Sequence, residues 1–442
     1  MNNTTAIEVA HDLERAISSA RQRLIDSRPA SAAAFRRAQA SMPGGNTRTV
    51  LHFDPFPLTF KRGAGSDLWD VDDACYSDFV GEFSAGLYGH SDPIIKQAIR
   101  DALDQGIVMG GPGDREVALA DLVTSRFPSI EQLRFCNSGT EANILALSAA
   151  IALSGKRKIL VFEGAYHGGV LAFSTPPSVL NIPWEYVYVP YNDTQGAIET
   201  IGRHADSLAA VIVEPILGAA GNIPGTASFL RALREATASA GVLLIFDEVK
   251  TSRCGAGGIQ GRLGISADFT TLGKYLGGGL PCGALGGRQH FMQRFDPSAP
   301  NAFRHAGTFN NNPCTMSAGL AGLSQIFTAS RADKFDAACE EIRLEFNAMF
   351  SSLDVPMRCV GQGSMFSVHF VRSEPANPSD IPRISARLMR LLHLELLLEG
   401  VVVASRGDIF VSLPVEQRHI AALKSALNGF AARWAPLLRA AV

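Results

Sequence analysis

Short runs of apolar residues alternate with longer amphipathic stretches through the middle of the chain. The runs include QLRFC, KILVF, AAVIVEP and GVLLIFDEV, and the stretches include SGTEANILALSAAIALSG and TASFLRALREATASAG. Because these runs lack polar alternation, we expect strands that are buried on both faces. Strands that alternate with helices favour an α/β fold, with a mostly parallel sheet wrapped by helices.

The two ends of the chain show other patterns. Residues 5–26 predict an amphipathic helix, and residues 93–106 predict another, which opens with proline and closes with glycine. Between them, DLWDVDDACYSDFV predicts a short hairpin that turns at its central Asp-Asp pair. After residue 330 we expect a long helix, a β-like stretch (GQGSMFSVHFV), a helix over 383–399 and a last β-like stretch.

These patterns divide the chain into three segments. Residues 1–75 form an N-terminal segment, a helix with small strands, that we expect to join the small domain. Residues 76–330 form the large α/β domain, and residues 331–442 form a smaller α+β domain at the C-terminus.

Composition and charge exclude several classes of protein. The chain has 442 residues, of which 46% are hydrophobic and 19% charged, as is typical of a globular protein. A formal net charge of −2 without a basic block argues against a nucleic-acid partner. We expect no signal peptide and no membrane span, because charges interrupt every apolar stretch. Seven scattered cysteines without a CxxC pair indicate free thiols, no metal site and a cytoplasmic protein.

Polar residues follow the predicted strands at the edge where ligands bind in α/β sheets. In FCNSGTEAN a strand ends and a helix begins near Ser138. With Gly139 and Thr140, this residue offers hydroxyls and free backbone N–H groups to a phosphate. A simple helix cap is the alternative.

Two further strand ends carry charged groups. Asp247 and Glu248 end GVLLIFDEV, where a buried carboxylate needs a positive partner, and a salt bridge to an arginine would also satisfy it. Lys274 stands alone in the glycine-rich TTLGKYLGGGLPCGALGG. A lysine acts as a nucleophile only when its amine is partly unprotonated, and its ordinary pKa is about 10.4.

One ligand would explain the three groups together. A phosphate on a helix start, a ring nitrogen held protonated by an aspartate and an aldehyde captured by a lysine describe pyridoxal 5′-phosphate. A nucleotide-binding loop is the other functional interpretation. It fails because Tyr275 stands where the Walker pattern requires serine or threonine.

Over residues 40–415 the chain resembles the class III, fold type I aminotransferases that depend on pyridoxal phosphate. The resemblance rests on NSGTEAN, FEGAYHGG, VEP, IFDEV, TLGKYLGGGLPCGALGGR and AGTFNNNP, in that order. Within this family the chain is similar to the branch that holds β-phenylalanine aminotransferases and glutamate-1-semialdehyde aminomutases. The resemblance implies a homodimer with its active sites at the interface.

The resemblance also implies roles for matching residues. Lys274 would form the Schiff base and move the substrate proton, and Asp247 would pair with the pyridine nitrogen. The remaining cofactor contacts would come from Ser138, Gly139, Thr140, Tyr166, His167, Glu214 and, from the neighbouring subunit, Thr308. His167 could instead be a structural histidine, and Glu214 would brace the site.

Departures from related patterns indicate the substrate. Val411 stands where ornithine and γ-aminobutyrate enzymes have a carboxylate-binding arginine, and Arg406 lies five residues earlier. Arg48 follows PGGNT near the N-terminus. In having two such arginines, the chain resembles the β-phenylalanine aminotransferases. The resemblance implies that each arginine binds a carboxylate. The alternative is that either arginine merely caps a loop. Glu82 and Tyr88, together with Phe83 and Leu87, would line the same pocket.

Lys250 departs from the family pattern, which has Gln or Met after IFDEV near the phenolic oxygen of the cofactor. This lysine could hold that oxygen ionised, point to solvent or offer a second amine to the aldehyde. The main alternatives for the whole chain are an aminomutase, an ω-amine aminotransferase and a regulatory protein that binds pyridoxal phosphate without turnover.

Overall fold

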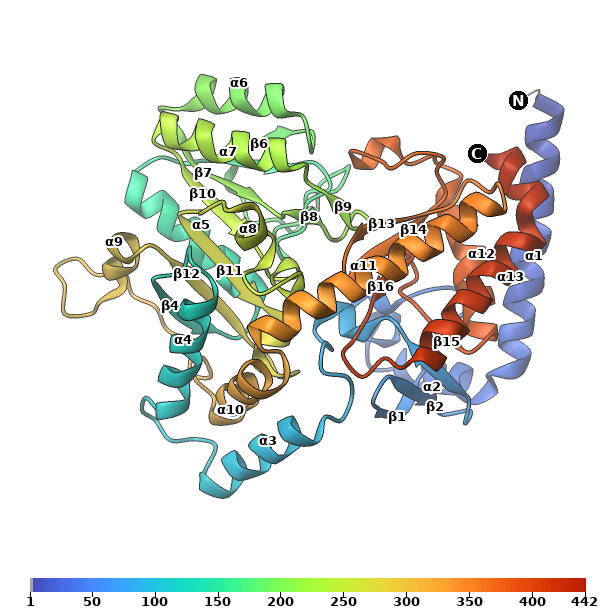
Figure 1. Ribbon diagram of the computed structural model, residues 1–442, viewed down its shortest axis with the longest axis horizontal. Coiled ribbons are helices and arrows are strands. Elements are labelled where there is room, and N and C mark those ends of the chain that lie inside the picture. The colour runs from blue at the N-terminus through green and yellow to red at the C-terminus, as the bar shows by residue number, and fades with distance from the viewer. Residues whose placement is uncertain (1–2) are drawn as a thin grey trace.

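The computed structural model describes residues 3–442, so residues 1 and 2 of the predicted N-terminal segment lie outside it. Its largest sheet has seven strands in the order β4-β12-β11-β10-β7-β5-β6. Every strand runs parallel to its neighbours except β12, which is antiparallel to β4 and β11. The mostly parallel sheet wrapped by helices is therefore confirmed (Figure 1). The strands are β4 (Gln132–Cys136), β5 (Lys158–Phe162), β6 (Glu185–Val189), β7 (Leu208–Val213), β10 (Leu243–Asp247), β11 (Phe269–Gly273) and β12 (Gly283–Gly287).

Helices pack against this sheet and against one another. Helix α5 packs across the sheet and contacts strands β4, β12, β11, β10 and β7. This packing places the first residues of α5 beside the end of β11. Helix α10 packs on α3 and α4 at one side of the large domain (Figure 1). The helices of this part are α3 (Pro93–Gln105), α4 (Asp114–Arg126), α5 (Gly139–Ser154), α6 (Thr194–His204), α7 (Ala227–Ala240), α8 (Gly258–Leu263), α9 (Gln289–Met292) and α10 (Pro313–Ala321).

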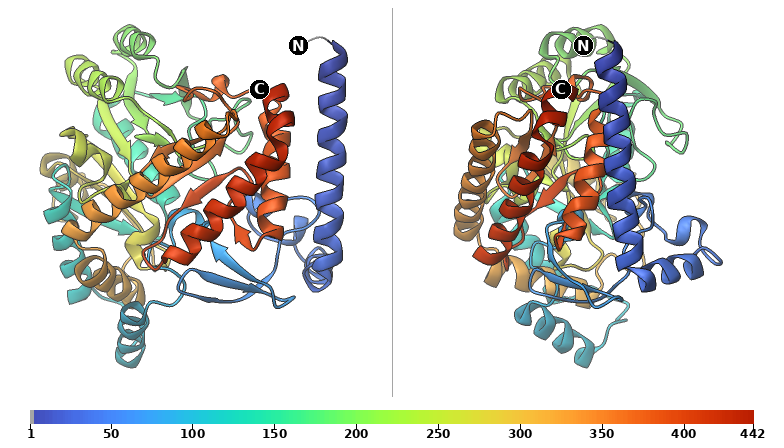
Figure 2. Two further views of the ribbon diagram at one scale, coloured as in Figure 1. Left: turned by 45° about the vertical axis from the view of Figure 1, so that its right-hand side comes forward. Right: turned by 90° about the vertical axis from the view of Figure 1, so that its right-hand side faces the viewer.

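The N-terminal and C-terminal segments share a second core. Strand β15 pairs in parallel with β3, and α1 packs along α12 and α13 (Figure 2). Leu13 and Phe79 lie in one apolar cluster with Phe350 and Leu427. The helices are α1 (Asn3–Ser27), α2 (Pro29–Ala38), α11 (Ala329–Ser352), α12 (Ser385–Leu398) and α13 (Gln417–Ala441). The strands are β1 (Phe60–Ala64), β2 (Asp67–Asp70), β3 (Cys75–Asp78), β13 (Arg358–Gln362), β14 (Met365–His369), β15 (Val401–Val402) and β16 (Asp408–Phe410), and β8 (Ile216–Leu217) and β9 (Ile223–Pro224) form a separate ribbon.

The local predictions hold with small shifts. The helices expected at 5–26 and 93–106 are α1 and α3, and β2 and β3 form the expected hairpin. The single β-like stretch GQGSMFSVHFV is divided between two antiparallel strands, because Gly363 adopts φ of 53° and turns the chain between β13 and β14.

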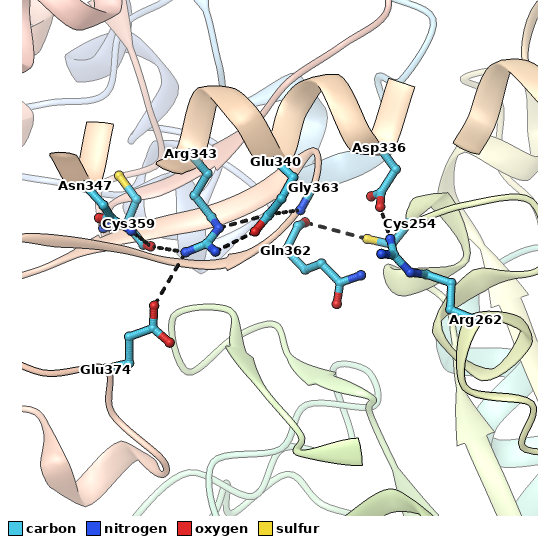
Figure 3. Close-up of polar contacts among 10 residues, drawn as sticks. All are labelled: Cys254, Arg262, Asp336, Glu340, Arg343, Asn347, Cys359, Gln362, Gly363 and Glu374. Atoms are coloured by element: carbon cyan, nitrogen blue, oxygen red, sulfur yellow. Dashed lines mark hydrogen bonds and ion pairs between the residues drawn. The ribbon is translucent and has the colours of Figure 1, made fainter. Parts of the chain in front are cut away.

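Helix α11 connects the two parts of the molecule (Figure 3). Near its start, Asp336 pairs with Arg262 of α8. Further along, Arg343 donates to the Cys359 carbonyl at 2.8 Å and binds Glu340 at 2.6 Å. Helix α11 therefore contacts both α8 and strand β13 of the three-stranded sheet.

No helix within residues 3–442 is long and apolar enough to cross a membrane.

Candidate active site

A buried carboxylate stands at the end of β10, at the centre of the site. The side chain of Asp247 is 4% exposed. Its Oδ2 atom contacts Nδ1 of His167 at 2.7 Å and accepts from the Asn143 amide at 2.8 Å. Its Oδ1 atom accepts from the Val249 backbone at 3.0 Å. The imidazole and the amide fix the direction in which this carboxylate points.

Asn143 lies within the motif FCNSGTEAN, but no role was predicted for it. This residue lies one turn into α5 and is 1% exposed. Its amide donates to Asp247 and to the His167 carbonyl, and its oxygen accepts from Thr271 at 2.6 Å. It thus joins α5 to β10 and β11. The available signal was an amide side chain at the head of the mostly apolar run ILALSAAIALS of α5.

The start of α5 provides free donors beside β11. Ser138 caps the helix by accepting from the Glu141 backbone at 3.1 Å. Within residues 3–442 the N–H groups of Gly139 and Thr140 have no hydrogen-bond partner. A side chain on Gly283 would come within 2.2 Å of the Ser138 carbonyl, so glycine in β12 permits this close approach. A helix start of this kind attracts an anion.

Lys274 follows β11 directly and has a strained backbone, with φ of 54°. Burial, with the neighbouring Lys250 as the next cause, lowers the pKa of its amine to about 7. No group within residues 3–442 forms a hydrogen bond or ion pair with the amine. The structure therefore presents an unpaired, partly neutral amine to the site.

Glu214 holds the loop that carries Tyr166. One carboxylate oxygen accepts from the Tyr166 backbone at 2.9 Å, and the other accepts from Gly218 at 3.1 Å. Burial raises the pKa of Glu214. The Tyr166 side chain remains 47% exposed, so its ring is available to a planar ligand.

The two candidate arginines flank one aromatic ring. Arg48 lies 5.1 Å and Arg406 lies 5.8 Å from the centre of the Phe83 ring. Arg48 pairs with Glu82, and Arg406 pairs with the fully buried Asp408. Both arginines also lower the pKa of Lys274, because they lie close to it. The positive charges of Arg48 and Arg406 therefore act on Lys274, and Glu82 pairs with Arg48.

The ring is presented by an unusual turn. Gly81, Glu82, Phe83 and Ser84 all have φ between 47° and 78°. Three non-glycine residues in the left-handed region store strain, which is common at functional sites.

Two of the residues predicted to line the substrate pocket lie elsewhere. Tyr88 is buried in the apolar core near Tyr275, at 6.3 Å between ring centres, and Leu87 lies in the same core. Neither joins Phe83 at the arginines. Thr308, which was expected to act from the neighbouring subunit, lies exposed in the loop before α10.

Comparison with known proteins identifies the family. The sequence model for class-III aminotransferases matches residues 51–428. The chain belongs to the class-III aminotransferases. It is 45% identical to the beta-phenylalanine transaminase of Variovorax paradoxus over 95% of this chain and 98% of the relative. A crystal structure of a beta-phenylalanine aminotransferase from the same organism superposes with a TM-score of 0.94, at 45% identity, over 96% of this chain and 99% of the other. A glutamate-1-semialdehyde 2,1-aminomutase of Exiguobacterium sibiricum is 37% identical over 84% of this chain and 88% of that protein.

Class-III aminotransferases work with pyridoxal phosphate, and this chain's residues fit that molecule. The unpaired amine of Lys274 suits its aldehyde, and the two free N–H groups suit its phosphate. The Nε2 atom of His167 is buried and has no hydrogen-bond partner within residues 3–442. The protein is a pyridoxal-phosphate-dependent aminotransferase.

Proposed function

We propose that this aminotransferase moves an amino group from a β-amino acid, such as β-phenylalanine, to a 2-oxo acid such as 2-oxoglutarate or pyruvate. The observation that carries the proposal is the pair of guanidinium groups around Phe83, close to Lys274. The similarity to a protein named beta-phenylalanine transaminase supports it.

Different residues of the chain would bind the cofactor and transfer the substrate proton. Lys274 would hold the aldehyde and then carry a proton to and from the substrate carbon. Asp247, oriented by His167 and Asn143, would keep the ring nitrogen protonated. The cofactor supplies an electron sink for the carbon that loses its proton. Ser138, Gly139 and Thr140 would bind the phosphate, and Tyr166 would cover the ring, with Glu214 fixing its loop.

The arginines would take the carboxylates of the two substrates. In a β-amino acid, one carbon lies between the carbon that bears the amine and the carboxylate. In a 2-oxo acid, the carboxylate is bonded directly to the carbon that reacts. Arg406 would bind the acceptor's carboxylate and, in turn, a group of the donor, while Arg48 would serve the second pocket. Each charged hydrogen bond contributes about 1.5–3 kcal/mol. Because both guanidiniums already have carboxylate partners, we expect substrate to compete with Glu82, which is the more exposed of these partners.

An apolar cavity beside the arginines would accept the donor's substituent. It has a volume of about 490 Å³ and reaches Glu82 and Phe83. Its other walls include Phe35, Val50, Leu51, Phe53 and Val403. These residues replace Leu87 and Tyr88 as the proposed apolar walls.

We also propose that two chains form a homodimer in the cytoplasm. Ile107, Val108 and Met109 expose their side chains in the loop before α4, and Phe309 does so in the loop that carries Thr308. The two loops touch, since Asn311 donates to the Gly111 carbonyl at 3.2 Å. A joined apolar patch of this kind favours contact with a second protein surface.

All seven cysteines are free thiols, which fits a reducing compartment such as the cytoplasm.

A product assay tests the proposal against the aminomutase and the ω-amine aminotransferase. The purified enzyme is given 3-amino-3-phenylpropanoate with and without 2-oxoglutarate, and glutamate is measured. We expect glutamate only when both are present. Turnover of glutamate 1-semialdehyde without any oxo acid would favour the aminomutase. Glutamate from simple terminal amines but not from the β-amino acid would favour the ω-amine enzyme.

A further inference from the structure

Lys250 is a second amine on the same edge of the sheet as Lys274. It lies three residues after Asp247, in the turn that follows β10. Its aliphatic stem packs against Gly218, where a Cβ atom would come within 2.5 Å of Cδ and 2.6 Å of Nζ. Its Nζ atom lies 4.9 Å from the centre of the Phe410 ring. The backbone on one side and the ring on the other hold the amine in place.

The charges around Lys274 are unequally neutralised. Four cations lie near one another there: Lys274, Lys250, Arg48 and Arg406. The two arginines have carboxylate partners in Glu82 and Asp408. No group within residues 3–442 makes a hydrogen bond or ion pair with Lys250. We have assigned Lys274 to the aldehyde of the cofactor. Of the four cations, Lys250 is therefore the one without an assigned anionic partner.

The acids that face Lys250 already have partners. Asp408 accepts from Ser367 at 2.6 Å through Oδ1 and pairs with Arg406 through Oδ2. Both oxygens of Glu214 accept backbone N–H groups, and Asp247 binds His167 and Asn143.

Burial lowers the pKa of Lys250 to about 8, while Asp408, Glu214 and Asp247 raise it and Arg406 lowers it further. Lys250 is half-buried and its ammonium lies over the Phe410 ring. Because the amine is partly removed from water and has no carboxylate partner within residues 3–442, an anion supplied by a ligand would stabilise its charged form.

We propose that Lys250 binds an anionic oxygen of a ligand in the active site. Two oxygens have this chemistry: a carboxylate of the substrate and the ring oxygen of pyridoxal phosphate. The inference rests on the family assignment but not on the β-amino acid, since either oxygen is present with other amino donors. It makes Lys250 a binding residue in addition to the two arginines.

The first arm of the test measures carboxylate binding. The cofactor-loaded enzyme is titrated by calorimetry with 3-phenylpropanoate, which has no amine and cannot react. If the partner is the substrate carboxylate, Lys250→Met weakens binding by about tenfold or more, whereas Lys250→Arg retains most of it. Lys334→Met, an exposed lysine on α11, is the matched control and leaves binding unchanged.

The second arm follows the visible spectrum of the loaded enzyme against pH without any substrate. If the partner is the ring oxygen, removing the cation disfavours the ionised form. The midpoint of the spectral transition then moves up by about one pH unit or more in Lys250→Met and stays in place in Lys334→Met.

Two results would overturn the proposal. One is a Lys250→Met protein in which neither the carboxylate affinity nor the spectral midpoint changes. The other is a Lys274→Ala protein whose cofactor is fixed by borohydride on the peptide that contains Lys250, because this lysine would then act as an amine and not as a cation. Neither readout depends on turnover of a β-amino acid, so failure here and failure of the proposed function are distinguishable.

Discussion

The amine of Lys274 is set apart from other lysines by its surroundings. Burial first, and the Lys250 charge second, lower its pKa to about 7. The neutral fraction therefore grows as the pH rises through 7, and an ordinary lysine would reach that point only near 10.4. We predict that the rate at which apoenzyme takes up pyridoxal phosphate rises through a midpoint near pH 7. Stopped-flow absorbance measures this rate, and a midpoint near 10 would contradict the prediction.

Lys250→Met provides a second test of the same environment. Removal of the like charge favours the ammonium form of Lys274, so the midpoint for cofactor uptake should move to higher pH. Lys334→Met should leave it in place. A downward shift would mean that Lys250 acts on Lys274 through something other than its charge.

His167 and Asn143 orient the Asp247 carboxylate, and its negative charge would pair with the ring nitrogen of the cofactor. Asp247→Asn removes a charged hydrogen bond worth about 1.5–3 kcal/mol, so cofactor affinity should fall by about tenfold to a hundredfold. Equilibrium dialysis of pyridoxal phosphate measures this change. Asp193→Asn is the control, because either residue caps α6 equally well. Equal affinities in Asp247→Asn and the wild type would remove Asp247 from the site.

Site residues were predictable from the sequence where a charged or hydroxyl-bearing residue follows a buried apolar strand. Lys274, Asp247 and the Ser138–Thr140 motif all lie at strand ends, and the structure brings them to one edge of the sheet. Asn143 and the Arg406–Asp408 pair were not predicted, because a side chain's partner depends on tertiary contacts that the sequence does not display. Tyr88 was assigned to the pocket, but it is buried in the apolar core near Tyr275.

At the scale of elements, the approach of α5 to β12 positions the helix start that we propose as the phosphate site. Gly283→Ala would force a Cβ atom to 2.2 Å from the Ser138 carbonyl, so the helix start must move. We predict about tenfold weaker cofactor binding and a loss of about 1–3 kcal/mol in unfolding free energy. Cofactor dialysis and chemical denaturation measure the two effects.

Gly202→Ala is the matched control, since a side chain there on α6 meets nothing within 4 Å. If Gly283→Ala binds the cofactor as tightly as this control, the close approach of the helix is not what forms the site.

The helices were predicted because their apolar residues recur at helical spacing over many residues, and strands β4, β5, β7 and β10 were predicted because each is a short apolar run between helices. Strand β12 was missed as a strand, since GALGG has neither alternation nor branched residues. It forms because β4 and β11 pair with it on both sides. The division of GQGSMFSVHFV was missed for a related reason, because a single glycine turn decides it.

At the scale of the whole molecule, the exposed loops at Val108 and Phe309 predict the assembly. Val108 is 84% exposed on an apolar patch. If the patch is the dimer interface, Val108→Asp weakens dimerisation by about 2 kcal/mol or more, roughly thirtyfold. Sedimentation equilibrium measures this, and Leu344→Asp on the outer face of α11 should remain dimeric. A monomeric wild-type protein would contradict the proposed homodimer.

The central claim is that this aminotransferase accepts the amine of a β-amino acid, and a single half-reaction tests it most directly. The loaded, yellow enzyme is mixed with 3-amino-3-phenylpropanoate without any oxo acid, and its visible absorbance is followed. We predict that the colour is lost in one turnover, and that 2-oxoglutarate then restores it with one glutamate formed per site. An unchanged spectrum with this donor, together with bleaching by an α-amino acid or a simple amine, would contradict it.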